Sequence, residues 1–185
     1  QAKSFLNIST KKKIILYGAQ NPQSKRKGWN IFIKTLKKLD NTKYFLLIFG
    51  NFWSQESLNK IGIEYKSLGF INDKKILNNI YSSADLFVAP SIQDAWPKTF
   101  AEAMYCGTPV VCFDNTSISE IVDHKVNGYI VKNFDADLLK KGIDWLSKEI
   151  MKNSFNKNNS RIKISNFSGD VIAKKYIKFY KKILI

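Results

Sequence analysis

Short continuous apolar runs recur along this chain, separated by stretches in which apolar residues repeat at helical spacing. The runs are too short for buried helices and are rich in Ile, Val, Leu and Phe, so each predicts a strand buried on both faces. Buried strands that alternate with helices predict an α/β fold, a doubly wound parallel sheet of about six strands with helices on both faces. The predicted strands are 13–19, 44–50, 63–69, 85–90, 109–113 and 128–131.

The segments between the strands predict helices, because their apolar residues fall every three or four positions. Gly107 follows the third of these helices and is expected to end it. The polar, Asn-rich stretch 151–160 predicts a loop. The predicted helices are 31–39, 73–83, 97–105, 117–123 and 135–150.

The last segment, 169–185, predicts an amphipathic helix. A helix with one apolar and one lysine-rich face can lie on an anionic membrane, which would give peripheral membrane contact. We favour the alternative, in which the aromatic face packs on this domain or on one missing from the chain. The apolar face carries Ile172, Tyr176, Phe179, Tyr180 and Ile183, and the basic face carries Lys174, Lys175, Lys178, Lys181 and Lys182.

The length of 185 residues predicts one domain, or one large domain with a tail. The chain opens at Gln1, and a leader of about a dozen residues leads straight into the first strand, so we expect a fragment. Residues 1–12 are interpreted as a leader or linker and 13–185 as the domain. No apolar stretch is long enough for a membrane span, and the N-terminus lacks the apolar core of a signal peptide.

The chain carries 30 basic and 15 acidic residues, a net charge of +15, which favours anionic partners such as nucleic acids, membranes or phosphate-bearing ligands. Only Arg26 and Arg161 are arginines. Proteins that read nucleic-acid sequence depend on the bidentate arginine fork, so we expect no nucleic-acid partner and interpret most lysines as a solvated surface. Two cysteines and one histidine, without a Cys-x-x-Cys pair, predict neither a zinc site nor disulfides. A reducing, cytoplasmic setting fits best.

Two acidic residues eight positions apart mark the most informative stretch of the sequence. Asp94 lies in the loop after a predicted strand, and Glu102 lies inside the helix that follows. Pro97 suits the first helical turn, which leaves the amides of Lys98 and Thr99 free at the positive end of the helix dipole. The pattern therefore predicts an anion site beside two carboxylates, at the carboxyl ends of the strands.

The stretch from Asp94 onward resembles the signature of the group 1 glycosyltransferases (glycosyltransferase family 4). That signature is an acidic residue, seven intervening residues, a glutamate and an Ala-Met-x-Cys-Gly-Thr-Pro-Val-Val tail, which here is 103–111. The Trp-Pro-Lys-Thr loop at 96–99 is similar to that of enzymes that assemble bacterial surface polysaccharides. Further similarities, in order along the chain, are Tyr17-Gly18-Ala19, Lys27-Gly28, Leu68-Gly69-Phe70, Ala84-Asp85, Pro90-Ser91, Gly128, Phe167-Ser168 and Tyr176.

The resemblance implies the Rossmann-like C-terminal half of a GT-B enzyme, which binds a UDP- or GDP-sugar. It implies retaining, metal-independent transfer without a cofactor to a saccharide or lipid-linked acceptor, in the synthesis of cell-surface polysaccharide or glycolipid. The acceptor would bind to an N-terminal domain absent from this chain, so the chain alone is expected to be inactive. The implied location is the cytoplasm, and the alternative is peripheral contact with the inner face of the membrane.

The resemblance also assigns roles to acidic and basic residues. Lys27 matches the lysine that binds the donor diphosphate, and Arg26 beside it is a candidate helper. Glu102 matches the acid that accepts hydrogen bonds from the ribose hydroxyls, and Asp94 matches the acid that contacts the donor sugar. The family usually has glutamate at the first of these positions, so Asp94 is one methylene shorter. Asp94 and Glu102 are the candidate catalytic residues.

The remaining implied contacts come mainly from the backbone. The amides of Lys98 and Thr99 match the loop that binds the distal phosphate, and the backbone near Phe70 and Ile71 matches the base pocket. Two further candidate substrate-binding residues are Trp96, between the two acids, and Gly18, at the end of the first strand. In the family an arginine often follows this glycine, whereas here Ala19 stands in its place.

Several other signals favour structural interpretations. Asp135-Ala136-Asp137 resembles a manganese-binding Asp-x-Asp, but it precedes a predicted helix and is interpreted as a helix cap. His124 is expected to be solvated, and Tyr105 and Cys106 to be buried at a helix end. A dinucleotide-dependent oxidoreductase would need a Gly-x-Gly-x-x-Gly fingerprint after the first strand, which the chain lacks. A basic, non-catalytic module that binds nucleic acid or a membrane surface is the remaining alternative.

Overall fold

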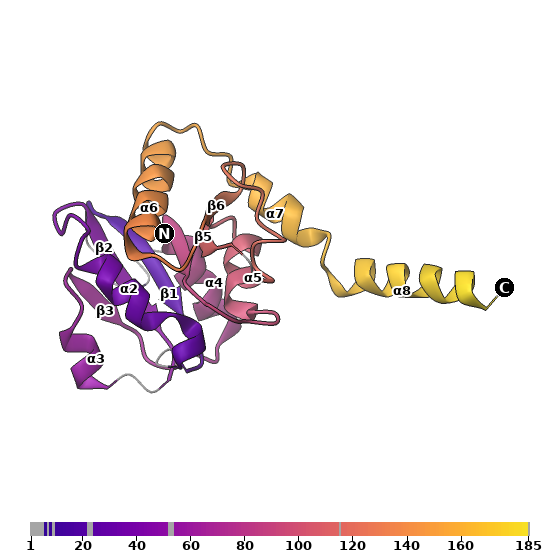
Figure 1. Ribbon diagram of the computed structural model, residues 1–185, viewed down its shortest axis with the longest axis horizontal. Coiled ribbons are helices and arrows are strands. Elements are labelled where there is room, and N and C mark those ends of the chain that lie inside the picture. The colour runs from indigo at the N-terminus through magenta and orange to yellow at the C-terminus, as the bar shows by residue number, and fades with distance from the viewer. Residues whose placement is uncertain are drawn as a thin grey trace.

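A six-stranded parallel sheet forms the centre of the computed structural model, which describes residues 6, 8, 10–21, 24–51, 54–114 and 116–184 (Figure 1). The strand order is β3-β2-β1-β4-β5-β6, so the chain winds outward from β1 in both directions. This confirms the predicted doubly wound sheet. The strands are β1 (Lys13–Gly18), β2 (Tyr44–Phe49), β3 (Tyr65–Ser67), β4 (Leu86–Ala89), β5 (Val110–Phe113) and β6 (Gly128–Val131).

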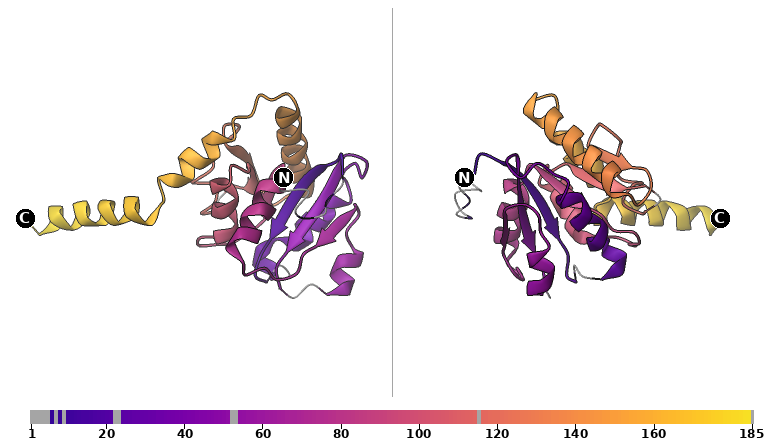
Figure 2. Two further views of the ribbon diagram at one scale, coloured as in Figure 1. Left: turned by 180° about the vertical axis from the view of Figure 1, so that it is seen from behind. Right: turned by 60° about the vertical axis from the view of Figure 1, so that its left-hand side comes forward.

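Helices cover both faces of the sheet (Figure 2). Helices α2 (Trp29–Leu36) and α6 (Ala136–Met151) pack on one face, and α4 (Lys74–Ser83) and α5 (Lys98–Tyr105) pack on the other. Because side chains alternate along a strand, β1 sends Ile14 and Leu16 into the second layer and Ile15 and Tyr17 into the first. The shorter elements are the 3-10 helix η1 (Lys25–Lys27), α3 (Gln55–Asn59) and α7 (Asn158–Ser165), the last packed against α5.

Three segments differ from the prediction. The expected helix at 117–123 is a series of turns, in which the amides of Ser119 and Ile121 bond to carbonyls only three residues back. The Ser119 hydroxyl also donates to the Thr116 carbonyl, and such local side-chain bonds compete with helix formation. Conversely, α7 occupies part of the expected loop, where the hydroxyl of buried Ser160 donates to the Asn127 carbonyl. The helix α3 was not predicted either.

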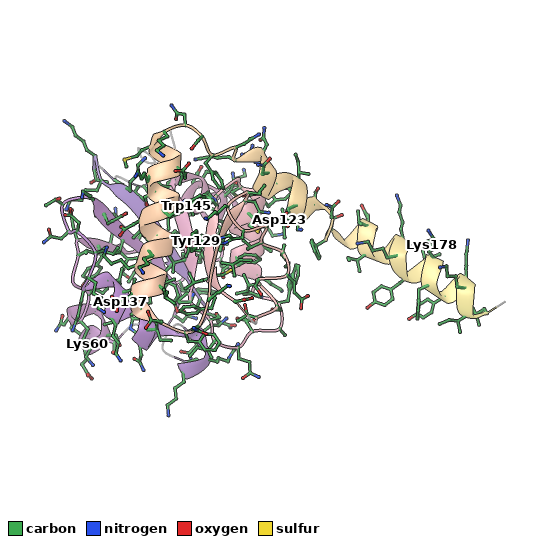
Figure 3. All side chains as sticks on the ribbon, turned by 45° about the horizontal axis from the view of Figure 1, so that its top comes forward. Lys60, Asp123, Tyr129, Asp137, Trp145 and Lys178 are labelled. Atoms are coloured by element: carbon green, nitrogen blue, oxygen red, sulfur yellow. The ribbon has the colours of Figure 1, made fainter. Side chains whose placement is uncertain are left out.

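The predicted C-terminal helix is α8 (Gly169–Ile183), which projects away from the sheet (Figure 1). None of its residues is buried, and Figure 3 shows the side chain of Lys178 standing clear of the domain. The apolar face therefore does not pack on this domain within the described residues, and its packing on another domain stays a prediction. Among the described residues no helix has both the length and the apolar character needed to cross a membrane.

Candidate functional site

A cavity of about 610 Å³ opens at the carboxyl ends of β1 to β4. Its size is typical of sites for small organic ligands. The loops that leave these strands and the first turn of α5 form its walls, as the fold predicts for a doubly wound sheet. Nearly all the predicted site residues line it, namely Arg26, Lys27, Phe70, Ile71, Asp94, Trp96, Lys98, Thr99 and Glu102.

Gly18 is the one predicted site residue that does not line this cavity. A Cβ at this position would lie 2.1 Å from the ring of Phe49, so the glycine makes room for that ring. Phe49 and Ala19 line the cavity in its place. Contact between Gly18 and a ligand remains a prediction. In the structure Gly18 contributes to the site by leaving room for the ring of Phe49, which lines the cavity.

Gly28 brings two loops of the site together. It has a φ of 68°, and a Cβ there would lie 1.7 Å from the carbonyl oxygen of Pro90. Only glycine allows both this conformation and this approach. The Arg26 carbonyl then accepts a hydrogen bond of 2.8 Å from the amide of Ile92, in the loop that carries Asp94.

Lys27 and Asp94 form a nearly buried ion pair in the cavity wall. The Lys27 Nζ contacts Asp94 Oδ2, and the two side chains are only 15% and 8% exposed. Arg26 approaches the same oxygen at 3.8 Å from a more exposed position. The Ser117 hydroxyl donates to the backbone carbonyl of Asp94 at 2.5 Å, which anchors the loop. Two cations and one carboxylate thus give this wall a net positive charge.

The first turn of α5 faces the cavity with unused backbone donors. Pro97 is the N-cap and not a residue of the first turn as predicted, so the helix begins at Lys98. The amides of Lys98 and Thr99 have no acceptor among the described residues, as expected at a helix start. The positive end of the helix dipole therefore adds to the charge of Lys27 and Arg26.

Tyr81, on α4, is a cavity residue that the sequence reasoning missed. Its hydroxyl donates to Glu102 Oε2 at 2.6 Å, while Glu102 Oε1 has no partner among the described residues. Burial, and secondarily this carboxylate, raise the pKa of the Tyr81 phenol, which keeps it protonated. In the sequence Tyr81 looks like an ordinary core position of an amphipathic helix, and nothing else there marks it.

A more apolar cavity of about 770 Å³ adjoins the first and shares Tyr81, Trp96 and Glu102 with it. Trp96 is 43% exposed, and its ring lies 5.7 Å from that of Phe167. Tyr105 lines this second cavity and is 70% exposed, so its predicted burial is wrong; it lies on the open side of α5. Cys106 is partly buried, its thiol donates to Asn78 Oδ1, and burial raises its pKa.

The Asp135-Ala136-Asp137 motif and His124 both have structural roles. Asp135 is the N-cap of α6 and accepts hydrogen bonds from the amides of Asp137 and Leu138, which confirms the interpretation as a helix cap. His124 is exposed, as predicted, and its Nδ1 accepts a hydrogen bond from the amide of Ile130. Within the described residues, no three His, Cys, Asp or Glu side chains cluster as metal ligands would.

Comparison with known proteins places the chain in a family. Residues 1–162 match the family model described as glycosyl transferases group 1. The chain belongs to the group 1 glycosyl transferases. This agrees with the family that the motif around Asp94 and Glu102 resembles.

Individual enzymes and solved structures are similar over most of this chain. The N,N′-diacetylbacillosaminyl-diphospho-undecaprenol alpha-1,3-N-acetylgalactosaminyltransferase of Campylobacter jejuni is 25% identical over 85% of the chain and 42% of its own length. Sucrose-phosphate synthase from Thermosynechococcus elongatus superposes with a TM-score of 0.82 and 23% identity, over 99% of this chain and 48% of its own. Anabaena HepE in complex with UDP-glucose superposes with a TM-score of 0.78 and 21% identity, over 97% of this chain and 51% of its own. The predicted Rossmann-like fold of the GT-B type is thus confirmed for this chain, and the chain spans about half the length of these proteins.

Proposed function

We propose that this chain is the donor-binding half of a retaining glycosyltransferase that binds a UDP- or GDP-sugar without a metal ion. One observation carries the proposal: a single cavity brings together two cations, a helix N-terminus and two carboxylates. These are the groups that a nucleotide diphosphate sugar requires, with cations and amides for the phosphates and carboxylates for the hydroxyls. The similarity to HepE, whose structure holds UDP-glucose, supports this choice of ligand.

The positive wall would assist departure of the nucleotide. When the bond between sugar and diphosphate breaks, negative charge develops on the leaving phosphate oxygens. Lys27, Arg26 and the amides at the start of α5 are held in place before the reaction and would stabilise that charge. Each charge-assisted hydrogen bond contributes roughly 1.5 to 3 kcal/mol, so three or four are consistent with micromolar donor binding.

The two carboxylates would bind the hydroxyl groups of the donor. Glu102 Oε1 has no partner among the described residues and would accept a hydrogen bond from the ribose. Asp94 is held by Lys27 and Arg26, and it becomes available to the donor sugar once these cations turn to the diphosphate. The base would lie against the loop that carries Phe70 and Ile71.

We further propose that transfer requires an N-terminal half that supplies the acceptor site, and that the acceptor is a saccharide or a lipid-linked saccharide. The undecaprenol-linked substrate in the name of the Campylobacter relative supports the lipid-linked choice. Sugar transfer to such an acceptor would take place at the cytoplasmic face of a membrane, in the synthesis of surface polysaccharide. The unpartnered apolar face of α8 would then pack on the N-terminal half.

A thermal-unfolding panel tests the proposal. The chain is unfolded with UDP-glucose, UDP-N-acetylglucosamine, GDP-mannose and double-stranded DNA, each with EDTA or with a divalent metal, and at two salt concentrations. A bound ligand at one hundred times its Kd stabilises the folded state by about 2.7 kcal/mol, so a true donor raises the melting temperature by several degrees. At least one nucleotide sugar should do so in EDTA. If none does, if the shift requires a divalent metal, or if only DNA at low salt produces a shift, the proposal is wrong.

A further inference from the structure

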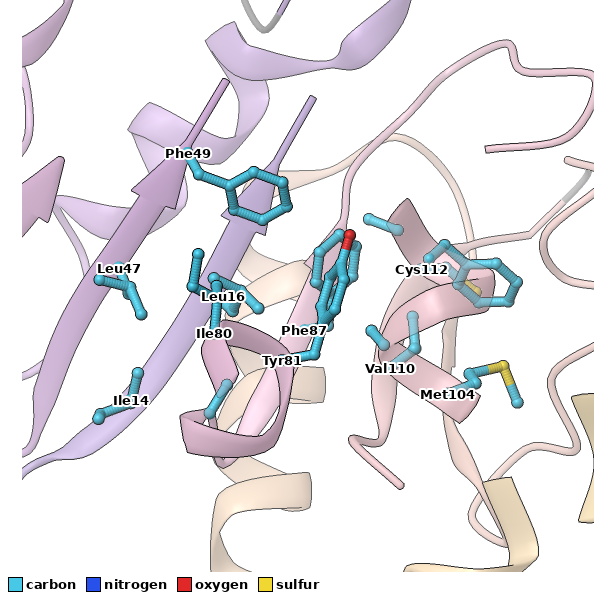
Figure 4. Packing of buried hydrophobic residues seen from close by; sticks show 14 of the residues in the cluster. Ile14, Leu16, Leu47, Phe49, Ile80, Tyr81, Phe87, Met104, Val110 and Cys112 are labelled. Carbon is cyan, nitrogen blue, oxygen red and sulfur yellow. The ribbon is translucent and has the colours of Figure 1, made fainter. Parts of the chain in front are cut away.

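Tyr81 is held rigidly, with its hydroxyl directed at the donor cavity. Its side chain is 1% exposed, and its ring lies edge-on to that of Phe49 at 5.7 Å. The ring of Phe87 lies 6.4 Å from that of Tyr81, and the Thr108 hydroxyl donates to the Tyr81 carbonyl at 2.7 Å. Figure 4 shows the ring packed among apolar residues, with its oxygen toward the end at which the strands finish. The packing of the ring therefore holds the Tyr81 hydroxyl in one position.

The Glu102 side chain, in contrast, is not held in place by packing. It is exposed, its long side chain has many rotamers, and the one hydrogen bond to its carboxylate within the described part of the chain comes from Tyr81. It also lines the neighbouring apolar cavity of about 770 Å³, so its carboxylate has room to turn away from the donor. The bond to Tyr81 decides which of these orientations Glu102 adopts.

We propose that Tyr81 is a positioning residue that holds Glu102 for the ribose, and so sets the preference of this site for ribonucleotides. By occupying Oε2, the phenol leaves Oε1 as the acceptor available to a ribose hydroxyl. An oriented carboxylate binds that hydroxyl without first losing rotamer freedom. The inference rests on the proposed function, because it needs a nucleotide in the cavity.

A purely structural role is the competing explanation. A buried phenol needs an acceptor, and Glu102 would merely satisfy it. Both explanations predict that Tyr81→Phe lowers the stability of the folded chain. They differ in what happens to the ratio between the affinities for a nucleotide with ribose hydroxyls and one without them.

The chain offers a matched control in Tyr44. This residue is also buried, at 4% exposure, and its hydroxyl also donates to a carboxylate, Asp144 Oδ1, at 2.8 Å. Tyr44 is the first residue of β2, at the end of the strand away from the cavity. Tyr44→Phe therefore removes a similar hydrogen bond without touching the site.

The experiment measures Kd by calorimetry for UDP and 2′,3′-dideoxy-UDP, and for GDP and 2′,3′-dideoxy-GDP, with the parent chain and both variants. For the nucleotide that binds the parent, Tyr81→Phe should reduce the ratio of ribo to dideoxy affinity by about three- to ten-fold. The loss should lie in the ribonucleotide, with the dideoxy affinity nearly unchanged. Tyr44→Phe should keep the parental ratio. In a Glu102→Gln background, adding Tyr81→Phe should leave the ratio unchanged, because the two residues act through one contact.

Each outcome decides between the explanations. A parental ratio in Tyr81→Phe that is folded by circular dichroism would overturn the positioning role and leave the proposed function intact. An unchanged ratio between Glu102→Gln and the parent would overturn it equally, and this variant leaves the buried ring in place. A parent that binds neither UDP nor GDP would overturn the proposed function and this inference together.

Discussion

The two ends of the sheet carry similar chemical groups in different surroundings. At the amino end, Asp144 accepts a hydrogen bond from Tyr44 on one oxygen and from Lys140 on the other, at 2.8 and 2.5 Å. At the carboxyl end, Lys27 pairs with Asp94 and Tyr81 bonds to Glu102. Both ends thus combine lysine, tyrosine and carboxylate.

The difference lies in which oxygen atoms remain available. Both oxygens of Asp144 are used, and its pair with Lys140 is substantially exposed, which is typical of a surface ion pair of small energy. Asp94 Oδ1 and Glu102 Oε1 have no partner among the described residues, and both side chains line a cavity. A saturated cluster stabilises the fold, whereas an unsaturated cluster in a cavity wall can bind a ligand.

The largest expected effect is the loss of nucleotide binding when Lys27 is removed. Lys27→Ala should weaken the binding of UDP or GDP by about 10- to 150-fold, the value of one charge-assisted hydrogen bond. Since Asp94 is then left with Arg26 alone, we also expect a lower melting temperature. Lys140→Ala, at the other end of the sheet, should leave the affinity unchanged. Calorimetry on both variants checks this, and equal affinity of Lys27→Ala and parent removes Lys27 from the site.

The second effect concerns the free oxygen of Glu102. Glu102→Gln keeps the size but removes the charge, so it should weaken ribonucleotide binding several-fold. The ribonucleotide should then bind no more tightly than the 2′-deoxynucleotide. Asp144→Asn is the matched change at the amino end and should alter neither quantity. If the glutamine variant still distinguishes the two nucleotides as the parent does, Glu102 does not bind the ribose.

The third effect has the opposite sign. Asp94→Asn removes the carboxylate that competes with phosphate for Lys27 and Arg26. Free UDP or GDP should therefore bind about fivefold more tightly, a gain of about 1 kcal/mol. The corresponding nucleotide sugar should gain less, because the variant loses the contact to its sugar. Weaker binding of the free nucleotide would show that Asp94 does not oppose the diphosphate.

The smallest effect is a pH dependence of stability outside both clusters. His124 is exposed, but a partial loss of solvation, with Lys125 and Lys132 nearby, lowers the pKa of its imidazole, and the neutral Nδ1 accepts a hydrogen bond from the amide of Ile130. A base with a lowered pKa in the folded state favours unfolding when it is protonated. The contribution of His124 should therefore be complete above about pH 6.5 and be lost as the pH falls through the folded-state pKa. His124→Asn should flatten the change in melting temperature between pH 7.5 and 5.5, and an unaltered profile contradicts this assignment.

Sequence patterns predicted the sheet well, because a run of six or more apolar residues such as 44–49 has no other stable place than a buried strand. They did not predict the surroundings of the helices. Helices α6 and α8 are both amphipathic, yet α6 buries Leu139 and Ile143 in the core while α8 buries nothing. Periodicity identifies an apolar face but not what covers it.

The same limit applies to the candidate site. The stretch from Asp94 to Glu102 brought one group of cavity residues to notice, since they share one loop and the helix that follows, and the family resemblance added residues from other loops, such as Lys27 and Phe70. Tyr81 escaped because it joins the site only when α4 packs beside α5, a contact between elements that spacing along the chain does not encode. Gly18, a predicted substrate contact, lies beside Phe49 and does not line the cavity, and the sequence does not show which side a glycine leaves open.

A crystal structure of this chain with UDP-glucose, or with GDP-mannose if only guanosine nucleotides bind, would show whether this cavity is the donor site. We expect the nucleotide in the cavity at the carboxyl ends of β1 to β4, with its diphosphate at Lys27 and the first amides of α5. We also expect Lys27 to leave Asp94 and a ribose hydroxyl to bond to Glu102. A nucleotide bound elsewhere, or bound here with the Lys27 and Asp94 pair intact and the diphosphate away from α5, would contradict the proposed donor site.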